Sequence, residues 1–373
     1  MYGTYYLADF TGSRINNITL MRLVAALFVL FGHCYSLSNG KGGTQDPISE
    51  LIRSFTGFHM GLPGLGVATF FTLSGFLITG SYAHWRSLPG YLESRILRIY
   101  PALFVAVLFC IGIGAFVSEL PLWAYLTHPA TIRFLWSNGS LIEFWPFLPQ
   151  VFVDNPWPNG TNGSLWTLPV EARMYIIVAT VGMLGFVATR ERFNFAMLIL
   201  IAGYLLGTHI SSTLTSLVPL RLALFFLLGA VSYTNARLIP MRFSLLCIVG
   251  IAAAILYRTG CYDYAFSVFL TYLILLIAYH PRLQVRPIDR IGDLSYGTYL
   301  YAFPITQISV KYLGAGRPLL IAAVVISLTL ILARLSWVFV EKPALEKKGR
   351  IVRIVNVWRS KLAAIRMADR KER

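Results

Sequence analysis

Two ionisable residues, Arg22 and His33, lie in one apolar stretch, residues 18–37, that is long enough to cross a membrane. An ionisable side chain inside hydrocarbon is costly, so it usually faces a protein interior or a cavity and marks function. Eleven residues of α-helix correspond to three turns and a rise of about 16 Å, which places both side chains on one face. The spacing predicts a polar stripe that lines a site between helices.

His33 and Glu171 are the two groups suited to proton transfer inside the membrane. Of the six histidines only His33 lies well within a predicted span, and of the sixteen acidic residues only Glu171 does. A neutral imidazole oriented by a carboxylate is a common general base near pH 7. We therefore predict His33 as catalytic base and Glu171 as its orienting partner. The alternative is a structural role, with Glu171 bonded to Arg173, Tyr175 or Arg221.

Three arginines are placed to bind phosphate at one end of this stripe. Arg22 lies near the start of its span, and Arg95 and Arg98 come just before another predicted span. Guanidinium groups bind phosphate oxygens in a bidentate manner, so these residues predict a basic mouth for a phosphate-bearing substrate. The alternative for Arg95 and Arg98 is a topology signal alone, and for Arg22 a side chain that extends to the membrane surface.

The composition defines the elements that must position these residues. Hydrophobic residues make up 56% of the chain, charged residues only 13%, and the mean hydropathy is +0.65. Long uncharged runs recur throughout, which is typical of a polytopic, all-α integral membrane protein. We predict ten transmembrane helices, at residues 18–37, 65–83, 100–118, 166–187, 194–210, 216–234, 243–258, 264–280, 294–312 and 319–340.

The distribution of positive charge predicts the orientation. With ten spans, 22 Lys and Arg side chains fall on one side of the membrane and six on the other, so both termini are expected in the cytoplasm. The tail from residue 342 carries eleven Lys and Arg against three acidic residues, interleaved with apolar ones. This pattern indicates a basic amphipathic segment on an anionic membrane surface rather than nucleic-acid binding, with a solvated tail as the alternative. We expect a transmembrane domain at 1–343 and a cytoplasmic tail at 344–373.

Two further signals concern small residues. The four cysteines show no paired spacing, so neither a disulfide framework nor a metal site is expected. The stretch 64–80 is rich in glycine but lacks the Lys-Ser/Thr of a phosphate loop, and its small residues suit close helix packing in lipid. Ser74, within this stretch, has no neighbouring base that would make it a nucleophile.

Six segments in order resemble the motifs of the acyltransferase 3 family of integral membrane O-acyltransferases, over nearly the whole chain. Two positions depart from the family pattern: Ala68 stands where many members have Asp, and Ala302 where many have His. The segments are the Arg22-x10-His33 pair, 66–79 (GVATFFTLSGFLIT), 95–101 (RILRIYP), 164–175 (SLWTLPVEARMY), 294–304 (LSYGTYLYAFP) and 336–343 (SWVFVEKP).

The resemblance implies transfer of an acyl group, usually acetyl, from cytoplasmic acyl-CoA to a hydroxyl of a cell-surface carbohydrate or its lipid-linked precursor. Acetyl-CoA would be a donor substrate at Arg22, Arg95 and Arg98, with no permanently bound cofactor. Substrate or structural support is expected from Ser74, Tyr175, Arg221 and Tyr299.

His33 would act as base on the acceptor hydroxyl, or else carry the acyl group transiently.

The expected location is the bacterial inner (plasma) membrane. The partners are the lipid bilayer, the two substrates and either a second copy of the chain or polysaccharide-assembly machinery. The alternative function is a proton-coupled transporter or flippase that uses the embedded His, Glu and Arg groups.

Overall fold

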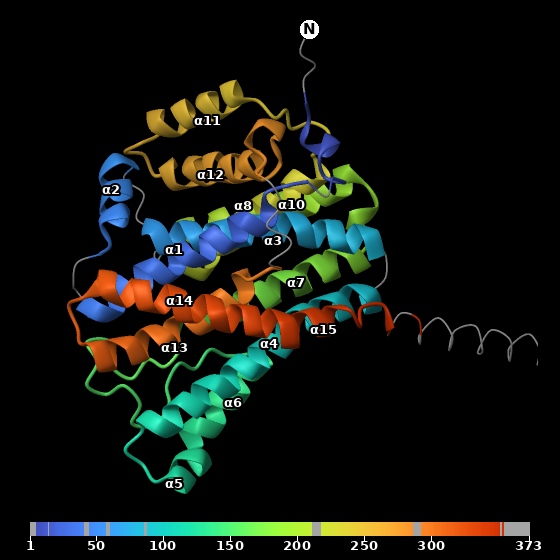
Figure 1. Ribbon diagram of the computed structural model, residues 1–373. Helices are drawn as coiled ribbons and strands as arrows, with labels where there is room; N and C mark the ends of the chain where they lie inside the picture. The colour runs from blue at the N-terminus through green and yellow to red at the C-terminus, as the bar shows by residue number, and fades with distance from the viewer. Residues whose placement is uncertain are drawn as a thin grey trace, which may run out of the picture.

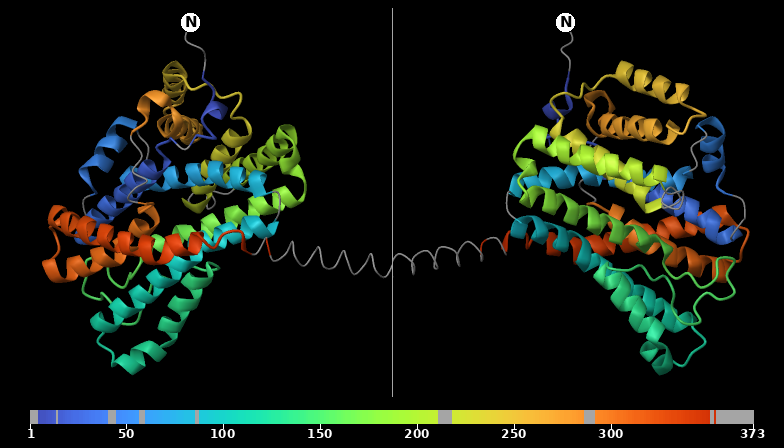
Figure 2. Two further views of the ribbon diagram at one scale, coloured as in Figure 1. Left: turned by 45° about the vertical axis from the view of Figure 1, so that its right-hand side comes forward. Right: turned by 180° about the vertical axis from the view of Figure 1, so that it is seen from behind.

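The computed structural model describes residues 5–13, 15–40, 45–56, 60–85, 88–210, 218–285, 292–350 and 353, and over these ranges it contains helices and no strands. Most helices run side by side in layers, while α5, α6 and the end of α4 that leads to them project from the bundle in every view (Figures 1 and 2). The helices are α1 (Ile18–Asn39), α2 (Pro47–Thr56), α3 (Gly61–Trp85), α4 (Leu88–Val117), α5 (Leu122–Thr127), α6 (Pro129–Ser140), α7 (Thr167–Met183), α8 (Arg190–Ile210), α10 (Val218–Thr234), α11 (Phe243–Ile255), α12 (Tyr262–Tyr279), α13 (Ser295–Leu313), α14 (Pro318–Ser336) and α15 (Lys342–Leu345).

A helix occupies each of the ten predicted segments, and the all-helical membrane class is confirmed. Among the described residues, five helices are long and apolar enough to cross a membrane: α1, α3, α4, α12 and the continuous stretch Pro318–Leu345. The count of ten spans and the cytoplasmic termini remain predictions. The basic tail beyond residue 353 lies outside the described residues.

Helix α3 is the central element, packed against α1 on one side and α10 on the other. Small residues permit this contact. A Cβ atom on Gly75 would lie 1.9 Å from the carbonyl oxygen of Phe226, and one on Gly229 would lie 2.2 Å from the carbonyl oxygen of Thr72. Two facing glycines thus bring α3 and α10 into backbone contact, which confirms the packing role predicted for the small residues of α3.

We expect Gly75→Val to weaken this contact, because no side chain fits between α3 and the Phe226 carbonyl. Overpacking of this kind costs about 1–3 kcal/mol and lowers the temperature of unfolding. The measurement is the thermal unfolding midpoint in detergent. Gly112→Ala on α4 is the control, since a Cβ there meets nothing within 4 Å. Equal midpoints for the two variants would contradict the close approach.

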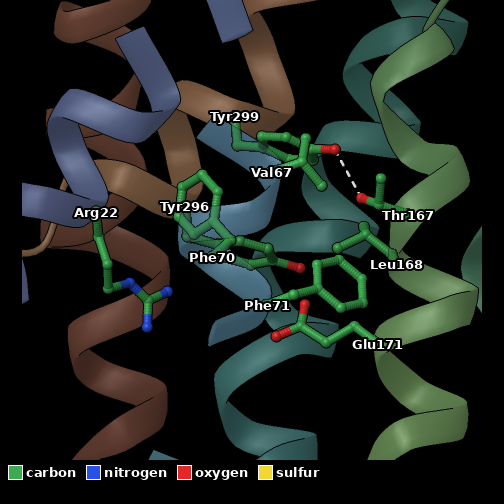
Figure 3. A pocket seen from close by; sticks show the side chains of 9 residues that line it. All are labelled: Arg22, Val67, Phe70, Phe71, Thr167, Leu168, Glu171, Tyr296 and Tyr299. Carbon is green, nitrogen blue, oxygen red and sulfur yellow. Dashed lines mark hydrogen bonds between the residues drawn. The ribbon is translucent and has the colours of Figure 1, made fainter. Parts of the chain in front are cut away.

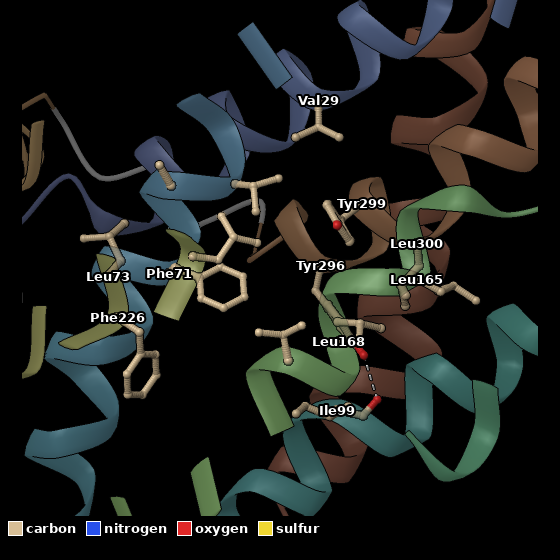
Figure 4. Close-up of a cluster of buried hydrophobic side chains, with 14 of the residues drawn as sticks. Val29, Phe71, Leu73, Ile99, Leu165, Leu168, Phe226, Tyr296, Tyr299 and Leu300 are labelled. Atoms are coloured by element: carbon tan, nitrogen blue, oxygen red, sulfur yellow. Dashed lines mark hydrogen bonds between the residues drawn. The ribbon is translucent and has the colours of Figure 1, made fainter. Parts of the chain in front are cut away.

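The first turn of α1 is fixed by Asn17. Its side-chain amide donates to the carbonyl oxygens of Ile277 and Leu283, both at 2.8 Å, and its Oδ1 accepts from the backbone N–H of Val285 at 2.9 Å. These bonds tie the start of α1 to the end of α12. The main cluster of buried hydrophobic side chains includes residues of α1, α3, α4, α7, α10 and α13 (Figure 4).

The segment between α6 and α7, which lies between the predicted spans 100–118 and 166–187, enters the bundle along α13. Gln307 donates to the carbonyl oxygens of Trp157 (2.9 Å) and Gly160 (2.6 Å), and further along α13 the Leu300 carbonyl accepts from Asn162 at 2.9 Å. Gln307 and Asn162 are fully buried. Polar side chains replace the missing backbone bonds of this irregular stretch, so α7 begins deep within the bundle.

The end of α14 carries a π-helical turn, Trp337–Glu341, that continues into α15. Such insertions alter the direction of the side chains that follow and often occur at functional sites. Here the turn buries Glu341, of which 2% is exposed, against Arg98 of α4. The C-terminal end of α14 is thereby joined to the start of α4.

Candidate functional site

Two adjoining cavities lie among α1, α3, α4, α7 and α13. The larger has a volume of about 310 Å³ and the smaller about 30 Å³. Arg22, Glu171 and Tyr296 line both, so one space narrows into the other. Figure 3 shows the smaller cavity with Arg22 and Glu171 on opposite sides of it. We call the larger space the basic cavity and the smaller one the narrow cavity.

The structure brings the three predicted arginines together. Arg22 on α1 and Arg95 and Arg98 on α4 all line the basic cavity. The two arginines of α4 are three residues apart and therefore lie on one face of that helix. A fourth cation, Lys348, comes from the segment that follows α15. The cavity thus has the charge required to bind a multiply charged anion.

Arg98 and Arg22 are held by acidic residues. Arg98 forms ion pairs with Asp293 and, at 3.5 Å, with Glu341, and Arg22 Nε lies 3.9 Å from Asp293. Burial of Asp293 disfavours its charged form, but Arg98, Arg22 and hydrogen bonds from Ser295 together lower the pKa of this carboxyl well below its usual range. This network joins α1, α4, α13 and the end of α14, and it fixes the shape of the cavity.

Arg95 has a different environment. Its Nε donates to Ser94 Oγ at 3.1 Å, its guanidinium lies 5.8 Å from the centre of the Tyr175 ring, and no described carboxylate lies within ion-pair distance. An arginine stacked on an aromatic ring but without a counter-charge is oriented to receive one. Among the three arginines, Arg95 is thus the one without a described ion-pair partner.

Glu171 does not pair with His33. Its Oε1 accepts hydrogen bonds from Ser74 Oγ at 2.7 Å and from Tyr175 OH at 2.5 Å. Glu171 also lies at the level of Arg22, because the segment before α7 carries the start of that helix deep into the bundle. The predicted orienting role of Glu171 is therefore wrong for this structure, whereas the alternative bond to Tyr175 is present.

His33 lies beyond the narrow cavity and lines neither space. It is half-buried and meets the edge of the Phe303 ring, with 5.2 Å between the ring centres. No hydrogen bond to its imidazole is present within the described ranges. Tyr299, which lines the narrow cavity, is one helical turn before Phe303, so the cavity ends about 6 Å below the level of His33.

Tyr299 closes the upper part of the narrow cavity. Its hydroxyl lies 2.6 Å from Thr167 Oγ1 and donates to the Ser164 carbonyl oxygen at 2.8 Å (Figure 3). These bonds connect α13 to the start of α7 in a buried position. Ser74 and Tyr175 likewise form hydrogen bonds to Glu171, and the roles of all three in substrate binding stay predictions.

Arg221 lies apart from the site, and its Nη2 is 3.3 Å from Asp263 Oδ2, which links α10 to α12. Arg221 is thus a structural residue that lines neither cavity.

Sequence reasoning missed three charged residues of the site: Asp293, Glu341 and Lys348. Asp293 directly precedes the motif-like segment 294–304. Glu341 lies inside the segment 336–343, where no role was predicted for it. One sequence signal could have indicated the two carboxylates. Several arginines were predicted at the basic mouth, and buried cations require nearby carboxylates. For Lys348 the sequence offered no signal beyond the general positive charge of the tail.

The fold and site define a helical, multi-pass membrane protein with a basic cavity that narrows between its central helices. The model of the acyltransferase 3 family, described as an acyltransferase domain, matches residues 15–338. The chain therefore belongs to this family and is a membrane acyltransferase.

Two of the relatives match over nearly their whole length. The O-acetyl transferase of Shigella phage Sf6 is 28% identical over 355 residues, which cover 90% of this chain and 98% of that protein. Nodulation protein 10 of Rhizobium leguminosarum bv. viciae is 27% identical over 372 residues, or 90% and 95% of the two chains. O-acetyltransferase OatA of Staphylococcus aureus is 34% identical over 109 residues, only 27% of this chain and 17% of that protein. No solved structure matches.

Proposed function

We propose that the chain transfers an acetyl group from cytoplasmic acetyl-CoA to a hydroxyl of a cell-surface carbohydrate, or of its lipid-linked precursor, in the bacterial inner membrane. The observation that carries this proposal is the basic cavity with four cations, which continues into a narrow cavity with both polar and apolar walls. The narrow cavity reaches Tyr299, one helical turn before the Phe303 ring that contacts His33. A donor with phosphates at one end and a thioester at the other matches this succession of environments. The names of two relatives, an O-acetyl transferase and O-acetyltransferase OatA, support an oxygen acceptor.

The donor is expected to enter from the Arg22 end of α1. Its phosphates would contact Arg95 first, because this guanidinium has no carboxylate partner among the described residues. The pantetheine arm would follow the α1 face that carries Arg22, Val29 and His33. The rise of about 16 Å from Arg22 to His33 suits an extended arm of this kind.

His33 would act as general base without help from Glu171. The acceptor O–H bond breaks as the proton passes to an imidazole nitrogen, and the oxygen forms a bond to the thioester carbonyl carbon. The C–S bond then breaks, and the CoA thiolate takes the proton back from the imidazolium to leave as free CoA. Contact with the Phe303 ring holds the imidazole without occupying its nitrogens. Transient acyl transfer to His33 itself is the alternative route.

Glu171 takes a different role in this scheme. With Ser74 and Tyr175 it forms a polar group between the two cavities, where a bound arm would turn from the basic cavity into the narrow one. It therefore acts as a positioning residue for the donor.

The acceptor is tested by the O-acetyl content of the surface carbohydrate in the source bacterium. Deletion of the gene is expected to remove base-labile acetate from one glycan, and complementation is expected to restore it. A complement with His33→Ala should not restore it, whereas a complement with Lys347→Gln should. Unchanged acetate on every surface glycan after deletion would contradict a carbohydrate acceptor.

A further inference from the structure

The basic cavity is completed by a segment outside the matched family region. The family model ends at residue 338, yet Leu345 and Lys348 line the cavity together with Arg95 and Arg98. This part of the wall therefore lies C-terminal to the matched region. Lys348 adds a fourth cation to the three arginines that line the cavity.

Lys348 has a defined position because the structure before it is anchored. The π-helical turn places Glu341 against Arg98 at 3.5 Å, and Glu341 also accepts from Ser336 at 3.2 Å. Helix α15 then packs against α4. The Lys348 ammonium lies 5.5 Å from the centre of a Trp85 ring, so its carbon chain extends toward the end of α3.

The charges around the cavity are compensated in part only. Asp293 and Glu341 pair with Arg22 and Arg98, and Glu171 also lines the cavity, bonded to Ser74 and Tyr175. No described carboxylate lies within ion-pair distance of Arg95 or Lys348. Partial burial and the charge of Arg95 lower the pKa of the Lys348 ammonium, while the buried Glu93 acts weakly in the opposite direction. Arg95 and Lys348 line one cavity without a described ion-pair partner, and two such cations suit a dianionic ligand.

We propose that Lys348 and Arg95 together bind the 3′-phosphate of the coenzyme A donor. This phosphomonoester carries a charge of about −1.5 to −2 at pH 7, which matches two cations that have no described carboxylate within ion-pair distance, whereas each phosphate of the diphosphate linkage carries one negative charge. The open edge of the basic cavity, where Lys348 is exposed to solvent, suits the nucleotide end of a long donor. The inference rests on the proposed acyl-CoA donor and adds a residue that selects for it.

The test is equilibrium binding of two ligands, CoA and 3′-dephospho-CoA, to the full-length protein in nanodiscs. Wild type is expected to bind CoA about tenfold more tightly, since a charge-assisted contact has roughly this value. Lys348→Gln should lose this preference by weakening CoA binding while 3′-dephospho-CoA binding stays unchanged. Lys347→Gln, which alters the adjacent exposed lysine, should bind both ligands as wild type does.

Three results would overturn the proposal: equal binding of the two ligands by wild type, no change in Lys348→Gln, or an equal loss for both ligands. The last would move Lys348 to the diphosphate. Turnover of acetyl-CoA is measured separately on the same samples. Selective binding of CoA without acetyl transfer would refute the proposed function and leave the phosphate site standing.

Discussion

Replacement of His33 by Ala is expected to reduce acetyl transfer by at least about a hundredfold, because general base catalysis typically contributes a factor of 10² to 10⁴. The measurement is the initial rate at which labelled acetate passes from acetyl-CoA to the acceptor, with the protein in nanodiscs. His33→Gln should be equally impaired, since an amide hydrogen-bonds but does not take up a proton at neutral pH.

The control for this prediction is His128→Ala. His128 accepts a hydrogen bond from the backbone N–H of Ala130 at the start of α6 and lines neither cavity. Its loss should leave the rate close to that of wild type. Donor binding by His33→Ala should also remain, because His33 lies above the cavities. A rate near that of wild type in His33→Ala would refute His33 as base.

Replacement of Asp293 by Asn is expected to destabilise the protein by about 3 kcal/mol. Removing one partner of a buried ion pair leaves the other charge uncompensated, at a cost of about 3–5 kcal/mol, and the Asp293 side chain retains 20% exposure. The matched control is Asp263→Asn, whose partner Arg221 and own side chain are 37% and 39% exposed. Such an exposed pair is worth about 0–1 kcal/mol. Thermal unfolding in detergent compares the two.

The ion pair of Asp293 with Arg98 also predicts how stability changes with pH. The folded protein lowers the pKa of Asp293, so the stability that its charge confers is present above the unfolded value near 4 and is lost as the pH falls below it. The difference in unfolding temperature between wild type and Asp293→Asn should therefore shrink below about pH 4. A difference that persists unchanged at pH 3 would show that the charge of Asp293 is unimportant.

The sequence was sufficient to predict the helical membrane class and the three arginines of the site. Arg22, Arg95 and Arg98 are uncommon charges beside apolar spans, and such residues gather where protein or water replaces lipid. The periodicity of α1 also placed Arg22 and His33 on one face, because that inference depends only on the geometry of a single helix.

The depth of Glu171 in the bundle could not be predicted from hydropathy. The prediction assumed that α7 begins at the membrane surface, as a span of ordinary length would. Buried hydrogen bonds from Gln307 and Asn162 instead draw the preceding segment into the bundle, and Glu171 descends with it. Such bonds between residues far apart in sequence leave no periodic signal.

Buried carboxylates were missed for a related reason. Helix α4 begins at Leu88, well before the apolar stretch at residue 100, and the π-helical turn carries the last helix on to Leu345. Residues that hydropathy assigned to the membrane surface, Glu93 and Glu341 among them, are therefore buried within the protein. Hydropathy measures contact with lipid, whereas helix ends in this bundle are set by contacts with other helices.

The most direct test of the proposed transfer uses purified protein in nanodiscs, acetyl-CoA labelled in the acetyl group, and the surface glycan of the source bacterium. We predict that label appears on the glycan as a base-labile ester, that free CoA appears in equal amount, and that both require wild-type His33. Consumption of acetyl-CoA without an ester product, or ester formation that continues at the wild-type rate in His33→Ala, would contradict the proposed transfer.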